Sequence, residues 1–184
     1  MIYHTTVLLH EGVDALSIKP DGVYVDATFG GGGHSKLILE KLETGRLFAF
    51  DQDPDAVVNS PKDDRFVLCK GNFRFLQNFL LANGADRVDG VLADLGVSGF
   101  QFDEASRGFS FRFDAQLDMR MNPAQELSAK QVVNAYSEAE LKRIFHTYGE
   151  TSFGSALARR IVNARQEEAI NTIEDLVKLI NKLV

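Results

Sequence analysis

The stretch Val23-Tyr-Val-Asp-Ala-Thr-Phe-Gly-Gly-Gly-Gly-His34 decides the fold of this 184-residue chain. Its first part, Val23–Thr28, is apolar and β-branched and predicts a buried strand that stops at the glycines. His34–Glu43 has apolar residues at helical spacing and predicts a helix. A glycine-rich turn between a strand and a helix is where doubly wound folds bind nucleotide-like ligands, because glycine lets the backbone approach a ligand.

Strand and helix signals continue to alternate beyond this stretch. Further strands are predicted at Arg46–Asp51, Phe66–Cys69 and Val88–Leu95, with a helix start at Pro54 and a helix over Phe75–Ala82. Strands separated by helices of this length indicate βαβ crossovers and a parallel sheet covered on both faces.

The pattern changes near residue 105. Gly108–Phe113 and the turn at Asn122–Pro123 predict irregular structure, and the remainder is helical. Each helix start is expected to carry a capping signature, as at Ser128, Ser137 and Thr172. We therefore predict two domains: 1–105, the N-terminal part of an α/β domain, and 106–184, a small all-helical domain.

Composition excludes several classes of protein. Hydrophobic residues make up 45% and charged residues 25%, which is typical of a soluble globular domain. No apolar run approaches the roughly 20 residues that span a bilayer, and Met1–Leu9 lacks the features of a signal peptide. The single cysteine, Cys69, cannot form an internal disulfide and is expected in the core. We expect a cytoplasmic protein without a metal site or a membrane partner.

The charge of the chain is unevenly distributed. A net charge of −6 argues at first against a nucleic-acid partner. From Arg107 to Arg165, however, nine Lys and Arg stand against six Asp and Glu. Either an RNA-facing surface or ordinary solvated helix faces would give this pattern.

Acidic residues follow the predicted strands, at Asp26, Asp51, Asp53 and Asp94. Asp51 comes 18 residues after Gly33, close to the spacing that places a carboxylate on ribose hydroxyls. The dinucleotide fingerprint is broken, since Ser35 or Lys36 stands where its third glycine is required, and no Walker lysine follows. Carboxylates repel pyrophosphate but suit S-adenosylmethionine, which has cationic groups and ribose hydroxyls and no phosphate.

Two residues of this region have alternative interpretations. Phe73 either stacks on an adenine or belongs to the core at the start of a helix. Asp26 either contacts the ligand or braces the loop.

Motifs along the whole chain resemble the bacterial small-subunit rRNA cytosine N4-methyltransferase family, the MraW/RsmH type. The matching segments are His4–Leu9, Asp26–Gly30, Gly32–Ser35, Phe50–Pro54, Asp94–Ser98, Arg107–Phe111, Leu117–Met121, Tyr148–Glu150 and Ala158–Ile161. The resemblance implies a Rossmann-like methyltransferase sheet, of which this chain has the first four strands, with an inserted helical domain. It also implies that S-adenosylmethionine contacts Gly32, Gly33, His34, Asp51, Phe73, Asp94 and Gln101. The chain departs from the family at Val97-Ser-Gly-Phe-Gln101, the segment that contains the implied Gln101 contact.

The resemblance further implies methylation of the exocyclic N4 of a cytidine in the decoding region of 16S rRNA, within the small ribosomal subunit. The usual Asp/Asn-Pro-Pro-aromatic turn of amine methyltransferases is absent, and Asp94-Leu-Gly96 stands in its place. The catalytic acceptor stays open between Asp94, Asp118 and a backbone carbonyl, and Asp118 is alternatively an ion-pair partner of Arg120. His34 is expected to position the loop or the cofactor.

Aromatic and basic residues alternate after residue 106. Phe109, Phe111 and Phe113 with Arg107 and Arg112 have the composition of a single-stranded RNA site. The same spacing also describes one buried face of an extended segment.

Two other classes of function compete with the methyltransferase: a nicotinamide-dependent oxidoreductase and a non-catalytic interaction module. A methyltransferase sheet normally has about seven strands, so we expect this chain to be a C-terminally truncated piece of a longer enzyme. Its sheet edge and helix faces would favour aggregation or pairing into a dimer. In such a piece we expect weak cofactor binding and no productive methyl transfer.

Overall fold

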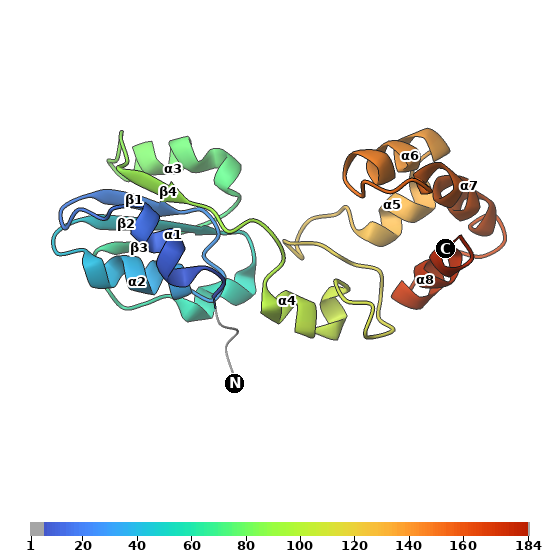
Figure 1. The fold of residues 1–184 in the computed structure, drawn as a ribbon, viewed down its shortest axis with the longest axis horizontal. Coiled ribbons are helices and arrows are strands. Elements are labelled where there is room, and N and C mark those ends of the chain that lie inside the picture. The colour runs from blue at the N-terminus through green and yellow to red at the C-terminus, as the bar shows by residue number, and fades with distance from the viewer. Residues whose placement is uncertain (1–5, 184) are drawn as a thin grey trace. The chain divides into compact units, whose positions relative to one another are not determined.

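The computed structural model describes residues 6–183 (Figure 1). His4 and Thr5, which open the first motif of the resemblance, lie outside the described residues. The chain divides into two compact units, 1–98 and 99–184, and each is described by itself. The division follows Ser98, whereas the sequence pattern changes near residue 105.

The first unit is a parallel sheet with helices on both faces. Its strands are β1 (Val23–Asp26), β2 (Arg46–Asp51), β3 (Phe66–Lys70) and β4 (Gly90–Leu92). Its helices are α1 (Leu9–Ala15), α2 (Gly33–Lys41) and α3 (Leu76–Ala82), with the 3-10 helices η1 (Pro54–Asn59) and η2 (Phe73–Phe75). The strand order is β3-β2-β1-β4 and every pair is parallel, which confirms the predicted α/β class.

Successive side chains of the central strands point to opposite faces of the sheet and belong to two separate cores. Tyr24 is buried with Val13 of α1 and Ile38 of α2. Phe48 packs on the opposite face, with Leu80 of α3. Figure 1 accordingly shows α1 and α2 on one side of the sheet and α3 on the other.

Two elements of this unit differ from the prediction. No helix was predicted at the N-terminal end, where α1 forms and covers the sheet. The strand predicted over Val88–Leu95 is confined to Gly90–Leu92. Within the described residues β4 has β1 as its one partner, so pairing ends where that ladder ends.

The second unit is helical, as predicted. It contains α4 (Gly99–Asp103), η3 (Ala105–Arg107), α5 (Ala129–Ala135), α6 (Glu138–Thr147), α7 (Gly154–Ala164) and α8 (Ile173–Asn181). Capping boxes start α5, α6 and α8 at Ser128, Ser137 and Thr172. The expectation of a cap at every start is wrong for α7, since Phe153 offers no side-chain acceptor. Leu117, Leu141 and Ile161 lie in the core of this unit.

Candidate functional site

The carboxyl ends of the four strands lie along one edge of the first unit's sheet. The chain order turns back between β1 and β4, which makes this the topological switch point. Four segments leave the strands here: the glycine loop (residues 27–33), 51–53, 71–73 and 93–98. Ligands of doubly wound folds bind in the crevice at such a point.

The glycine loop requires glycine for reasons of shape. Gly30 and Gly32 have φ values of 50° and 78°, in the left-handed region. A Cβ on Gly32 would lie 3.0 Å from the Phe29 ring, and one on Gly33 would lie 2.0 Å from the Thr6 hydroxyl. Thr6 therefore packs directly on the start of α2. Close packing is a sufficient reason for glycine at both Gly32 and Gly33.

Asp26, the last residue of β1, braces the glycine loop through hydrogen bonds. Its side chain is fully buried, and its two carboxylate oxygens accept hydrogen bonds from the Thr28 backbone N–H (3.1 Å) and the Ser35 hydroxyl (2.7 Å). Burial raises the pKa of the Asp26 carboxyl. Of its two interpretations, the structure shows the brace.

Asp51 ties the end of β2 to the same loop. One carboxylate oxygen accepts the Gly30 N–H and the other accepts the Asp53 N–H, each at 2.8 Å. The residue is half-buried. A carboxylate offers about four lone-pair positions, so the two hydrogen bonds leave Asp51 with capacity to accept two more. This is the geometry expected of a carboxylate that receives two hydroxyls.

Asp94 follows β4 and is exposed. Its backbone N–H donates to the Thr28 hydroxyl oxygen at 2.7 Å. The structure thus brings Asp94 beside the glycine loop, as the parallel order predicts. No local pattern in the sequence points to Thr28, because its partner depends on β4 lying beside β1.

Phe73 opens η2 after β3 and is 42% exposed, which contradicts its interpretation as a core residue. Asn72 caps this turn by accepting the Arg74 N–H and donates to the Gln52 side-chain oxygen at 3.1 Å. The loops after β2 and β3 are therefore joined, and the Phe73 ring is presented at their edge.

His34 and Gln101 are both buried, each 6% exposed. His34 lies under α1, where a Cβ on Gly12 would come within 3.6 Å of its Nε2. Gln101 belongs to α4 of the second unit. Five of the seven predicted contacts, Gly32, Gly33, Asp51, Phe73 and Asp94, thus lie on segments at the strand ends, with His34 just behind them.

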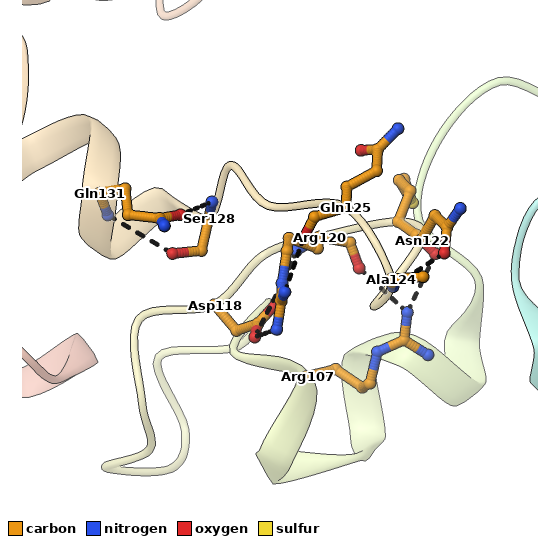
Figure 2. Close-up of polar contacts among 9 residues, drawn as sticks. Arg107, Asp118, Arg120, Asn122, Ala124, Gln125, Ser128 and Gln131 are labelled. Carbon is orange, nitrogen blue, oxygen red and sulfur yellow. Dashed lines mark hydrogen bonds and ion pairs between the residues drawn. The ribbon is translucent and has the colours of Figure 1, made fainter.

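In the second unit, Arg107 is 7% exposed and faces inward (Figure 2). Its guanidinium donates to the backbone carbonyls of Arg120 (3.0 Å) and Met121 (3.2 Å). Gly108, at φ 70°, comes so close to the facing chain that a Cβ would lie 2.6 Å from the Gln116 carbonyl. The hypothesis that Arg107 faces RNA is wrong: it holds the base of the loop that follows it.

Asp118 and Arg120 form a forked ion pair, which Figure 2 shows. Arg120 Nε and Nη2 donate to the two carboxylate oxygens at 3.0 and 2.7 Å, and Nη1 donates to the Gln125 carbonyl. The Arg120 guanidinium lowers the pKa of the Asp118 carboxyl. The ion-pair interpretation of Asp118 is therefore the observed one, and a carboxylate so stabilised is a poor proton acceptor.

The segment after Arg107 forms an exposed aromatic loop. The buried-face interpretation is wrong for Phe111 and Phe113, whereas Phe109 is half-buried. Phe111 is 79% and Phe113 39% exposed. Arg112 contacts the Phe113 ring and pairs with Asp103 at 2.5 Å. An open groove of about 230 Å³ runs along the loop, lined by Phe111, Phe113, Asp114, Ile173, Glu174 and Val177.

Other reactive groups are few in the described part of the chain. Residues 6–183 contain no cluster of three or more His, Cys, Asp or Glu that could hold a metal ion. Cys69 is buried in β3, and burial raises the pKa of its thiol. None of the helices in this range is long and apolar enough to cross a membrane.

Fold and site together define a Rossmann-like α/β unit with carboxylates at the carboxyl ends of its strands, followed by a helical unit. The model of the MraW methylase family matches residues 1–184. The chain belongs to this family.

Relatives named ribosomal RNA small subunit methyltransferase H share about half of the sequence. The protein from Flavobacterium johnsoniae is 56% identical over 99% of this chain and 61% of its own length. Those from Christiangramia forsetii and Bacteroides thetaiotaomicron are 54% and 51% identical over 100% of this chain. The chain thus spans about 60% of the length of these relatives.

Proposed function

We propose that this chain provides the cofactor site and the helical unit of an S-adenosylmethionine-dependent methyltransferase that modifies RNA of the small ribosomal subunit in the cytoplasm. Membership of the MraW methylase family and the names of the relatives support this proposal. The observation that carries it is Asp51, a half-buried carboxylate fixed by two backbone donors with acceptor positions left over.

The residues at the strand ends fit the chemistry of S-adenosylmethionine. Asp51 would accept the ribose hydroxyls, and the exposed ring of Phe73 would stack on the adenine. Asp94 adds an exposed carboxylate that attracts the cationic groups. Gly32, Gly33, His34 and Gln101 stay in the proposed set on the strength of the family resemblance.

For the acceptor we propose the exocyclic N4 of a cytidine in the decoding region of 16S rRNA. The bound cofactor would supply a methyl group activated by a sulfonium. The chain must hold the amine in line and accept its proton, and positioning alone contributes up to about 7–11 kcal/mol in favourable cases. Asp94 is the proposed acceptor, because Asp118 is neutralised by Arg120.

We assign the RNA contact to the aromatic loop of the second unit. A cytidine must leave its stack before its amine is accessible, at a cost of a few kcal/mol. Exposed Phe111 offers a stacking surface, and Arg112 offers a cation next to it. Arg107 has no part in this contact, because it is buried.

Calorimetric titration of the chain with S-adenosylmethionine and with NAD tests the cofactor proposal. We expect saturable binding of S-adenosylmethionine and none of NAD. Binding of NAD alone would favour an oxidoreductase, and binding of neither would favour an interaction module. Radiolabelled methyl transfer to undermethylated small subunits, by a chain of the relatives' full length, tests the reaction itself.

A further inference from the structure

The segment that follows β1 is bonded to strands on both sides. The Ala27 N–H donates to the Leu92 carbonyl of β4 at 2.8 Å. The Phe29 N–H donates to the Phe50 carbonyl of β2 at 2.9 Å. The residue between them, Thr28, therefore has its backbone fixed from both directions.

A side chain replaces the next rung of the β1–β4 ladder. In a parallel ladder, the N–H of Asp94 would donate to the carbonyl of Ala27, two residues after the Ala27-to-Leu92 rung. It donates instead to the Thr28 hydroxyl oxygen, at 2.7 Å. The two strands stop pairing at this point, yet the backbone of Asp94 stays attached to the glycine loop.

The Thr28 hydroxyl is itself held in place through buried groups. The Thr28 N–H donates to one oxygen of Asp26, whose other oxygen accepts the Ser35 hydroxyl of α2. Asp26 and Ser35 are both fully buried. An acceptor anchored in this way gives the Asp94 amide a defined position, although the Asp94 residue is exposed.

We propose that Thr28 is a positioning residue, whose hydroxyl ends the β1–β4 ladder and sets Asp94 at the edge of the crevice. The inference rests on the proposed function, because Thr28 acts through Asp94. Threonine suits the task, since its branched Cβ restricts the hydroxyl to few rotamers and the oxygen accepts at hydrogen-bond distance.

Amide hydrogen exchange at Asp94 tests the positioning without any cofactor. Thr28→Val keeps the shape and removes the acceptor, so the Asp94 amide should exchange at least about tenfold faster than in the unaltered chain. Thr28→Ser should restore most of the protection. Thr44→Val, at an exposed turn before β2, is the matched control and should leave the rate unchanged. An unchanged rate in Thr28→Val overturns the inference, whether or not the chain binds cofactor.

Titration with S-adenosylmethionine tests the consequence for the site. Thr28→Val should bind about tenfold more weakly, Thr28→Ser within about twofold of the unaltered chain. In an Asp94→Ala background, Thr28→Val should cause no further loss, because the group that it positions is gone. A full tenfold loss in that background would show that Thr28 acts elsewhere and would overturn the inference. Absence of binding by the unaltered chain, with fast Asp94 exchange in Thr28→Val, would reject the proposed cofactor while supporting the positioning.

Discussion

The strand ends around the glycine loop in the first unit and the loop of residues 107–121 in the second hold their charged residues in opposite ways. At the strand ends, Asp51 is held by backbone N–H groups, one of them from the glycine loop, and keeps capacity to accept further hydrogen bonds. In the second loop, Asp118 is neutralised by Arg120, and Arg107 is bound by carbonyls. Charged residues therefore form a candidate binding site in the first region and hold the backbone together in the second.

The difference shows that the partners of a charged residue decide whether it indicates a binding site. A carboxylate fixed by neutral donors retains its charge and its capacity to bind a ligand. A carboxylate in a guanidinium fork, or a guanidinium that donates to backbone carbonyls, has used much of that capacity for structure. Within one motif, Arg107 is buried and bound by backbone carbonyls, whereas Arg112 is exposed and pairs with Asp103 at the surface.

The largest effect is expected for Arg107→Ala. It removes a buried cation that donates to two carbonyls, and hydrogen bonds to charged groups contribute about 1.5–3 kcal/mol each. The free energy of unfolding of the second unit should fall by about 3 kcal/mol, measured by urea denaturation, while S-adenosylmethionine affinity is unchanged. Arg112→Ala is the matched control and should stay within about 0.5 kcal/mol. Equal stability of the two variants would refute the scaffold role.

Asp51→Asn comes next and tests the strand ends of the first unit. If the carboxylate accepts two ribose hydroxyls, cofactor binding should weaken by about 1.5–3 kcal/mol, the range for hydrogen bonds with a charged partner. Calorimetric titration gives the dissociation constant. Asp86→Asn, at an exposed position, should bind as the unaltered chain does. An unchanged constant in a folded Asp51→Asn variant removes the residue from the site.

Phe111→Ala separates the aromatic loop from the scaffold beneath it. Because the ring is 79% exposed, its loss should change stability by less than about 0.5 kcal/mol. Affinity for a single-stranded RNA oligonucleotide, followed by fluorescence anisotropy, should fall by about 1–3 kcal/mol, the value of one stacked base. Leu127→Ala, another exposed apolar position, should have no effect on RNA. Equal affinities of the two variants would exclude the loop from the contact.

The smallest effect concerns the pH dependence of stability, which has opposite signs for Asp118 in the second unit and Asp26 in the first. The folded-state pKa of Asp118 lies below its ordinary value of 3.8, so its ion pair stabilises the chain above that pH and is lost as the pH falls. Asp118→Asn should therefore remove about 1 kcal/mol near neutral pH and nothing at acid pH.

Asp26 supplies the contrasting case. Burial raises its pKa above 3.8, so its ionisation destabilises the fold as the pH rises through that raised value. Asp26→Asn should reduce this loss of stability, and thermal melting from pH 3 to pH 8 would reveal both slopes. Parallel profiles for the two variants would contradict the assignment of the two carboxylates.

The sequence by itself determined the elements whose signals are local. Strand β1, the glycine turn and α2 follow from one uninterrupted stretch, and the capping boxes at Ser128, Ser137 and Thr172 need only residues three apart. The parallel order of the strands then placed Asp51 and Asp94 at one edge of the sheet. Membership of the family was also indicated by the ordered motifs alone.

Only the tertiary structure decided which partner each polar or aromatic side chain has. The bonds of Arg107 to the Arg120 and Met121 carbonyls, and the bond from Asp94 to Thr28, join segments that no local pattern connects. The exposure of Phe111 likewise depends on how the whole unit packs. The shortness of β4 has the same origin, because a strand extends only as far as its neighbour accepts its hydrogen bonds. Local conformational preferences act over a few residues, whereas burial and hydrogen bonding depend on distant ones, and that is why the sequence determined the elements and the fold determined their roles.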